Sequence, residues 1–166
     1  MFAVDTKRMK DAKVVVLIPV YNEEKTIGAV IKEIPRKISG VAEVKVLVMD
    51  DHSSDNTAKV AEQVGADYIF TNKKNSGLGV NFKNGIEQAL KLGADIIVNI
   101  DGDGQFDPKE IPLLINPIIT NGADMVTGSR FLSDSLTRDM TMMKKWGNRR
   151  FTKLISRIIT KNLFSE

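Results

Sequence analysis

The chain has 166 residues, a net charge of +3 at neutral pH and no cysteine, which excludes disulfides and thiolate metal sites. Hydrophobic residues make up 42% and charged residues 27%, as is ordinary for a globular domain with one core. No stretch approaches the ~20 apolar residues that a membrane-spanning helix needs.

The first predicted element is a buried strand over residues 14–19, VVVLIP. A helix over residues 22–34 follows, with Asn22 as its predicted N-cap and Pro35 after its end.

Predicted strands and helices continue to alternate along the chain. Their order is a strand at 44–49, a helix at 53–65 ended by Gly65, a strand at 67–70, a helix at 78–92 ended by Gly93, a strand at 95–100, a helix capped by Asp107, and a strand at 124–129. Because the strands are continuously apolar, they indicate a mostly parallel sheet covered by helices on both faces. The sequence thus predicts an α/β fold, in which ligands bind beyond the carboxyl ends of the strands.

Polar side chains follow the predicted strands at the positions where such a ligand would bind. Four of them suit helix starts, caps or turns: Asn22, Glu23, Asp55 and Asp107. The pair Asp50 and Asp51 and the pair Asp101 and Asp103 are harder to explain in this way. Neighbouring carboxylates raise each other's pKa and cost stability unless a cation or a hydrogen-bond donor intervenes. We therefore expect these two pairs to have a functional role.

The segment NIDGDGQFDP places oxygen-bearing side chains at alternate positions, Asp101, Asp103 and Gln105. A calcium loop of the EF-hand type does not fit, because Phe106 and Pro112 occupy its glycine and glutamate positions. A dinucleotide-binding fingerprint is a weak match to GLGVNFKNG, because the spacing differs from G-x-G-x-x-G. The remaining hypothesis is a site for Mg²⁺ or Mn²⁺, where the cation would neutralise charge on a departing diphosphate.

Five motifs, in this order and spacing, resemble those of family 2 glycosyltransferases with the GT-A fold: IPVYNEE, VMDDHSSDNT, NSGLGVNFKNGI, NIDGDGQFDP and GSRF. The resemblance covers residues 13 to about 131, and five motifs in order are specific although each alone is weak. Within the family, the chain is most similar to the dolichyl- or polyprenyl-phosphate sugar synthases. The resemblance implies a Rossmann-like GT-A domain over residues 1–132 that binds a nucleotide sugar.

The resemblance also implies roles for individual residues. Asp101 and Asp103 would form a metal-binding D-x-D motif, with Gln105 as a further metal ligand. The implied nucleotide-binding residues are Pro19, Tyr21, Glu23, Asp51, Asn75, Gly77, Gly79 and Asp101. Asp103 and Arg130 are the implied catalytic residues, and Arg130 follows the last predicted strand toward the active site.

The implied activity is that of an inverting hexosyltransferase that depends on Mg²⁺ or Mn²⁺. It would move a hexose from a donor of the GDP-mannose or UDP-glucose type to polyprenyl or dolichyl phosphate, with no nucleic acid as a partner. Such an acceptor is largely ionised at neutral pH, since the second pKa of a phosphomonoester is about 6, so it needs positioning more than a general base. Two alternatives stay open: an acceptor with a saccharide hydroxyl, which does need a base, and a non-catalytic module that binds nucleotide or metal.

The basic residues concentrate in the C-terminal segment. From Arg138 onward there are eight basic and two acidic residues, a net charge of +6 against −3 for the rest of the chain. Apolar residues recur there at helical spacing, from Phe151 to Ile159. We expect residues 133–166 to form a mobile acceptor loop and an amphipathic helix that packs on protein or lies on an anionic membrane surface. Because family members usually continue further, often with membrane helices, we expect a C-terminally truncated chain on the cytoplasmic side of a membrane. It would be peripheral, or anchored by segments that this chain lacks.

Overall fold

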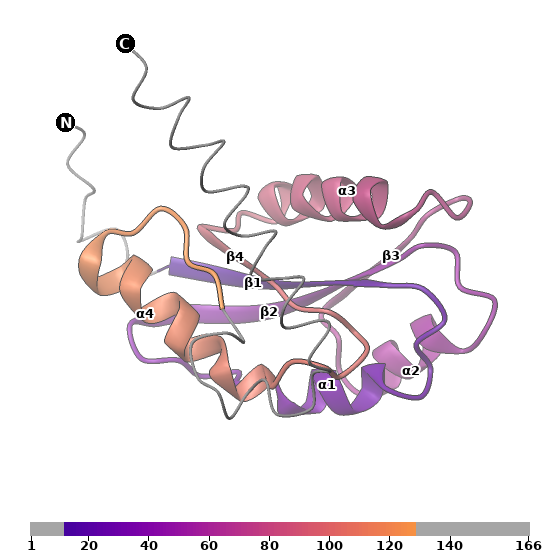
Figure 1. The fold of residues 1–166 in the computed structure, drawn as a ribbon, viewed down its shortest axis with the longest axis horizontal. Helices are drawn as coiled ribbons and strands as arrows, with labels where there is room; N and C mark the ends of the chain where they lie inside the picture. The colour runs from indigo at the N-terminus through magenta and orange to yellow at the C-terminus, as the bar shows by residue number, and fades with distance from the viewer. Residues whose placement is uncertain (1–11, 129–166) are drawn as a thin grey trace, which may run out of the picture. The chain divides into compact units, whose positions relative to one another are not determined.

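A computed structural model describes residues 12–128 of the chain, and these residues form a four-stranded, fully parallel sheet (Figure 1). Its strands are β1 (Ala12–Val20), β2 (Val41–Asp50), β3 (Tyr68–Thr71) and β4 (Ile96–Asn99). Their spatial order is β3-β2-β1-β4, so the chain builds outward from β1 in one direction and then returns to its other side. All of these elements belong to one of two compact units, Met1–Thr127, the other being Gly128–Glu166. The predicted parallel sheet is confirmed, and the predicted domain boundary at residue 132 stays a prediction.

Helices cover both faces of the sheet, as the sequence predicts. They are α1 (Ile27–Glu33), α2 (Thr57–Gln63), α3 (Leu78–Lys91), the short 3₁₀ helix η2 (Pro108–Glu110) and α4 (Ile111–Asn121). Figure 1 shows α3 on one face of the sheet and α1, α2 and α4 on the other. The side chains of β1 alternate accordingly: Val16 belongs to the same buried cluster as Ile31 of α1 and Ile115 of α4, whereas Leu17 belongs to the cluster that includes Ala89 of α3.

Helix α3 carries a glycine, Gly85, where it packs against β1 and β2. A Cβ atom on Gly85 would lie 2.5 Å from Cδ1 of Leu17 and 3.0 Å from Cγ of Met49. No larger residue fits there, since Leu17 and Met49 are themselves buried. The glycine therefore sets the position of the helix whose amino end borders the candidate site.

Two predicted elements differ in the structure. Helix α1 begins at Ile27, and Thr26 is its N-cap, so the prediction that Asn22 caps it is wrong. Asn22 instead has a backbone φ of +56°, in the left-handed region. The strand predicted at 124–129 is also absent, because residues 124–128 form no strand and residue 129 lies outside the described part.

The predicted helix ends are confirmed by their backbone geometry. Gly65 and Gly93 follow α2 and α3 with φ values of +92° and +78°, which glycine adopts without strain. Asp107 caps η2 by accepting a hydrogen bond from the N–H of Lys109 at 2.9 Å. Across residues 12–128 no helix has both the length and the apolarity to span a bilayer. The predicted C-terminal helix lies outside the described residues.

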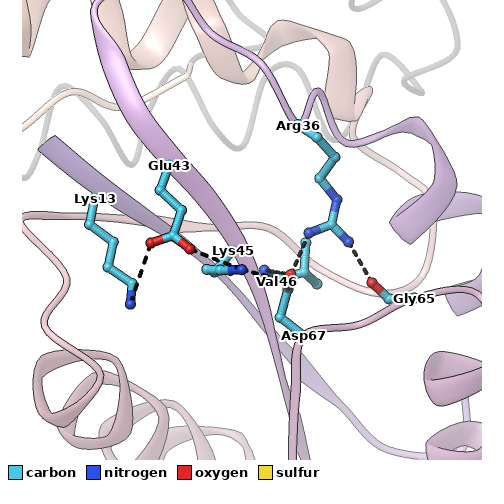
Figure 2. Close-up of polar contacts among 7 residues, drawn as sticks. All are labelled: Lys13, Arg36, Glu43, Lys45, Val46, Gly65 and Asp67. Carbon is cyan, nitrogen blue, oxygen red and sulfur yellow. Dashed lines mark hydrogen bonds and ion pairs between the residues drawn. The ribbon is translucent and has the colours of Figure 1, made fainter. Parts of the chain in front are cut away.

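A group of ion pairs ties together the amino-terminal parts of β1, β2 and β3 (Figure 2). The carboxylate of Glu43 contacts Nζ of Lys45 at 2.9 Å and Nζ of Lys13 at 3.7 Å. Lys45 also contacts Asp67 at 3.4 Å, and Arg36 pairs with the same aspartate. The charges of this group support the sheet at the ends of the strands opposite the polar segments that the sequence singles out.

Candidate functional site

A cleft of about 370 Å³ opens at the carboxyl ends of β1, β2 and β4, within the size range of small-molecule sites. The segments that follow these strands and the start of α3 line it: Pro19, Val20, Tyr21, Glu23, Asp51, Asn75, Gly77, Leu78, Asn81, Asp101, Gly102 and Asp103. Strand order reverses between β1 and β4, which is where open parallel sheets bind their ligands. The topology and the lining thus locate the candidate site at one edge of the sheet.

Most of the residues that the sequence singles out come together in this cleft. Of the predicted site residues within 12–128, the following eight line it: Pro19, Tyr21, Glu23, Asp51, Asn75, Gly77, Asp101 and Asp103. Gly79 and Gln105 do not line the cleft and are exposed. Arg130 lies outside the described residues. The chemical role of each of these residues stays a prediction.

The loops after β1 and β2 are joined by hydrogen bonds that hold one rim of the cleft. The N–H of Asn22 donates to Oγ of Ser53 at 2.9 Å, and the N–H of Ser54 donates to Oδ1 of Asn22 at 2.8 Å. The N–H of Glu23 donates to Oγ1 of Thr57, a fully buried threonine, at 2.8 Å. These bonds fix the backbone that leaves β1, so Asn22 serves as a link between two loops.

Asp55 extends the same link and closes the turn that precedes α2, whose N-cap is Asn56. Its carboxylate accepts the N–H of Thr57 at 2.9 Å and the N–H of Glu24 at 3.2 Å. In return, the carboxylate of Glu24 accepts the N–H of Asn56 at 3.0 Å. Burial raises the pKa of Asp55, but the hydrogen bonds outweigh it and the pKa lies below its ordinary value. Of the interpretation of Asp55 as a cap or turn residue, the turn is confirmed, whereas the N-cap of α2 is Asn56.

Asp51 is 3% exposed at the floor of the cleft, and its carboxylate is held by the loop between β3 and α3. It accepts hydrogen bonds from Nδ2 of Asn72 at 2.7 Å, from the N–H of Ser76 at 2.9 Å and from the N–H of Gly77 at 2.7 Å. Burial raises the pKa of this carboxyl, but Asn72 and the two backbone donors outweigh it, with a smaller contribution from His52. The net pKa lies below the ordinary value, so Asp51 is ionised at neutral pH.

The pairing of Asp50 with Asp51 therefore has a structural explanation. Asp50 is 2% exposed and accepts hydrogen bonds from the backbone N–H of Ser53, at 3.2 Å, and from its hydroxyl. Protein donors surround both carboxylates, so no cation is needed to account for them. The rise in pKa expected for neighbouring carboxylates is wrong for Asp51, because donated hydrogen bonds stabilise its charge.

Three asparagines behind Asp51 form a network that the sequence analysis missed. Nδ2 of Asn72 donates to Oδ1 of Asp51 and also to Oδ1 of Asn81, the latter at 3.0 Å. Nδ2 of Asn81 donates to the carbonyl of Met49 at 2.8 Å, and Nδ2 of Asn84 donates to Oδ1 of Asn72 at 3.3 Å. The only available signal was the position of Asn72, which directly follows a strand. Asn81 is 1% exposed yet lines the cleft.

The other acidic pair differs, because Asp101 has no hydrogen bond or ion pair with any residue of the range 12–128. Oδ1 of Asp103 accepts the N–H of Gln105 at 2.9 Å and keeps most of its accepting capacity. Among residues 12–128 no group of three or more histidine, cysteine, aspartate or glutamate side chains is placed to hold a metal. Two carboxylates suit a hard cation whose other ligands are phosphate oxygens and water, as is usual for Mg²⁺. The residues present therefore fit such a cation.

The sequence of the chain is similar to one protein family and to named enzymes. Residues 15–166 match the family model described as Glycosyl transferase family 2. The chain is 31% identical, over 84% of its length and 61% of the relative, to UDP-N-acetylglucosamine–dolichyl-phosphate N-acetylglucosaminyltransferase of Methanococcus voltae. It is 30% identical, over 80% of its length and 37% of the relative, to dolichol-phosphate mannosyltransferase of Pyrococcus furiosus. The chain thus spans less than two thirds of the length of both relatives.

Solved structures show the same fold. Glucosyl-3-phosphoglycerate synthase of Mycobacterium tuberculosis, in complex with Mn²⁺, UDP and glucosyl-3-phosphoglycerate, superposes with a TM-score of 0.55 at 26% identity. The match covers 70% of this chain and 43% of the synthase. A structure of the same synthase with Mg²⁺ and UDP gives a TM-score of 0.52 at 25% identity, over 72% of this chain and 45% of the synthase.

Proposed function

The chain belongs to glycosyl transferase family 2, and we propose that it transfers a hexose from a nucleotide-diphosphate sugar to a polyprenyl or dolichyl phosphate, with inversion. One observation carries the proposal: Asp101 and Asp103 share a single cleft with Tyr21 and Asp51. The cleft thus combines carboxylates for a cation with an aromatic ring and an acceptor for a nucleoside. The names of the relatives from M. voltae and P. furiosus support a dolichyl phosphate acceptor.

The nucleoside end of the donor is assigned to the side of the cleft formed by β1 and β2. Tyr21 is 48% exposed, and its ring can stack on a base. The ionised carboxylate of Asp51 can accept a hydrogen bond from a base. Gly77, which lines the cleft together with Pro19, has no side chain, so the ligand can approach its backbone closely. The UDP in the mycobacterial complexes supports a nucleotide as the ligand.

Asp101 and Asp103 are assigned to the diphosphate, where they would hold Mg²⁺ or Mn²⁺ together with phosphate oxygens. When bound, the cation supplies neutralisation of the charge that develops on the leaving diphosphate. Gln105 has weaker support as a further ligand, because it is exposed and does not line the cleft. The acceptor phosphate attacks the anomeric carbon opposite the diphosphate, and Arg130 is assigned to orient that phosphate.

A transfer assay tests the proposal. The chain is incubated with UDP- and GDP-sugars, Mn²⁺ and a short-chain polyprenyl phosphate, and we expect the labelled sugar to move to the lipid. Transfer to a saccharide instead would favour the hydroxyl acceptor. Donor binding without any turnover, including hydrolysis of the donor, would favour a non-catalytic module. No binding of any nucleotide sugar would overturn the proposal.

The metal assignment has its own test and a matched control. Because Asp103 is assigned to the cation, Asp103→Asn and EDTA should each weaken donor binding at least about tenfold, the equivalent of about 1.4 kcal/mol. Asp107→Asn changes a neighbouring aspartate that caps η2 outside the cleft, and it should leave donor affinity unchanged. Equal affinity of the wild type with and without EDTA would contradict the assignment.

For the whole protein we propose a location at the cytoplasmic face of a membrane. The support is the basic segment from Arg138, which lies outside the described residues. Each Lys or Arg near an anionic surface contributes about 1 kcal/mol, an attraction that decays over a Debye length of about 8 Å in physiological salt. Sedimentation with phosphatidylserine vesicles should therefore show binding that salt weakens and that Arg150→Gln, Lys153→Gln and Arg157→Gln together weaken strongly. Indifference to such vesicles would overturn this location.

A further inference from the structure

The carboxylate of Asp51 is nearly saturated by the protein itself. An ionised carboxylate has about four accepting positions, two on each oxygen. Oδ1 accepts from Nδ2 of Asn72 at 2.7 Å and from the N–H of Ser76 at 2.9 Å. Oδ2 accepts from the N–H of Gly77 at 2.7 Å and shares the Ser76 N–H at 3.1 Å. Within the described part of the chain, this leaves Oδ1 full and one position on Oδ2 for a ligand.

Of these donors to Asp51, only Asn72 donates from its side chain; the others are backbone N–H groups. Neighbouring residues fix the orientation of the Asn72 side-chain amide. Oδ1 of Asn72 accepts from Asn84, so the Nδ2 group lies toward Asp51 and Asn81. The amide of Asn81 is oriented in turn, because its Nδ2 donates to the carbonyl of Met49. These hydrogen bonds thus hold Nδ2 of Asn72 on Oδ1 of Asp51.

The proposed donor carries either guanine or uracil, and these two bases need different hydrogen bonds from a carboxylate. Guanine presents two adjacent donors, N1–H and the exocyclic N2–H, which pair with both oxygens of one carboxylate. Uracil presents a single donor, N3–H, between two carbonyls. A guanine at Asp51 would leave one donor without a partner in a buried position, which costs affinity, whereas uracil needs only the position that Oδ2 offers.

We propose that Asn72 makes the cleft selective for a uracil nucleotide over a guanine nucleotide, by occupying the position on Oδ1 of Asp51 that guanine would need. Asn72 acts through Asp51 and is a specificity-determining residue that does not itself touch the base. The inference rests on the proposed function, because it names the nucleotide of the proposed donor.

Calorimetric titration of the 166-residue chain with UDP and with GDP, each with Mn²⁺, tests the selectivity. We expect UDP to bind about tenfold or more tightly than GDP, since one unmade hydrogen bond to a charged group weakens binding by at least that factor. Equal or tighter binding of GDP would overturn the inference and leave the proposed function standing, because GDP-sugars are nucleotide donors too. Binding of neither nucleotide would overturn both.

A variant tests the role of Asn72 itself. Asn72→Ala frees a position on Oδ1 of Asp51, so the ratio of the UDP and GDP affinities should fall several-fold toward one. Asn56→Ala is the matched control, because Asn56 donates to Glu24 outside the cleft, and it should keep the wild-type ratio. An unchanged ratio in folded Asn72→Ala, checked by circular dichroism, would overturn its role. If that variant does not fold, the wild-type comparison still decides whether the cleft is selective.

Discussion

Gly102 and Val20 pack so closely that a Cβ atom on the glycine would lie 2.6 Å from Cγ1 of the valine. Val20 is 3% exposed and belongs to the core below the cleft, so it cannot move aside freely. Gly102→Ala should therefore destabilise the fold by about 1–3 kcal/mol, the usual cost of overpacking. It should also weaken donor binding with Mn²⁺, because Asp101 and Asp103 flank the glycine. Urea unfolding and calorimetry measure the two effects.

Gly79→Ala is the control for this variant. No heavy atom of the described residues lies within 4 Å of the Cβ that this change would add, and the position is helical. We expect stability to stay the same or to rise by about 0.4–1 kcal/mol, because alanine restricts the unfolded chain. Wild-type stability in Gly102→Ala would show that the contact with Val20 can relax.

Asn22 links two loops by hydrogen bonds and has a backbone conformation that most residues avoid. Two substitutions separate the contribution of the hydrogen bond from that of the backbone conformation. Asn22→Gly keeps the φ of +56° accessible but removes the acceptor of the Ser54 N–H, so it should cost about 0.5–1.5 kcal/mol. Asn22→Ala should cost about 1–3 kcal/mol more, because it adds backbone strain. Urea unfolding measures both variants. Equal stability of the two would show that the hydrogen bond alone decides.

The alternation of apolar runs with helix signals was enough to predict the sheet and its two helical layers. It was enough because β1 and the second half of β2 are buried on both faces, which leaves little choice of element. The start of α1 was mispredicted since Asn22, a good N-cap by residue type, bonds to Ser53 and Ser54 more than thirty residues away. Local patterns cannot reveal such long-range bonds.

The candidate site was only partly predictable, because its hydrogen bonds also join residues far apart in the sequence. Polar residues at strand ends indicated its place, but their partners depend on the folded chain. Asp50 and Asp51 have the same residue type and adjacent positions, yet Ser53 holds one and the loop before α3 holds the other. The role of Asn72 depends on which hydrogen-bond donors reach Asp51. The spacing of residues in the sequence does not reveal how many donors do so.

The acid sensitivity of the fold should depend on Asp67, which immediately precedes β3. Burial raises the pKa of its carboxyl, but the N–H of Val46, at 2.7 Å, and the guanidinium of Arg36 outweigh it, helped by Lys45. The net pKa is lowered, so the charged form stabilises the fold above the ordinary carboxyl pKa of about 3.9. That contribution is lost as the pH falls through the lowered value.

Asp67→Asn removes the charge and keeps an oxygen that can accept the Val46 N–H. At pH 7 we expect it to lower the free energy of unfolding by roughly 0.5–1 kcal/mol, as for partly exposed ion pairs. The difference from the wild type should shrink below about pH 4, where the unfolded aspartate binds a proton, and should also shrink in 1 M salt. Glu62→Gln is the control, because Glu62 is exposed and its side chain forms no ion pair within residues 12–128. Urea unfolding between pH 2.5 and 7 measures both variants, and a difference for Asp67→Asn that does not change with pH would show that the charge contributes nothing.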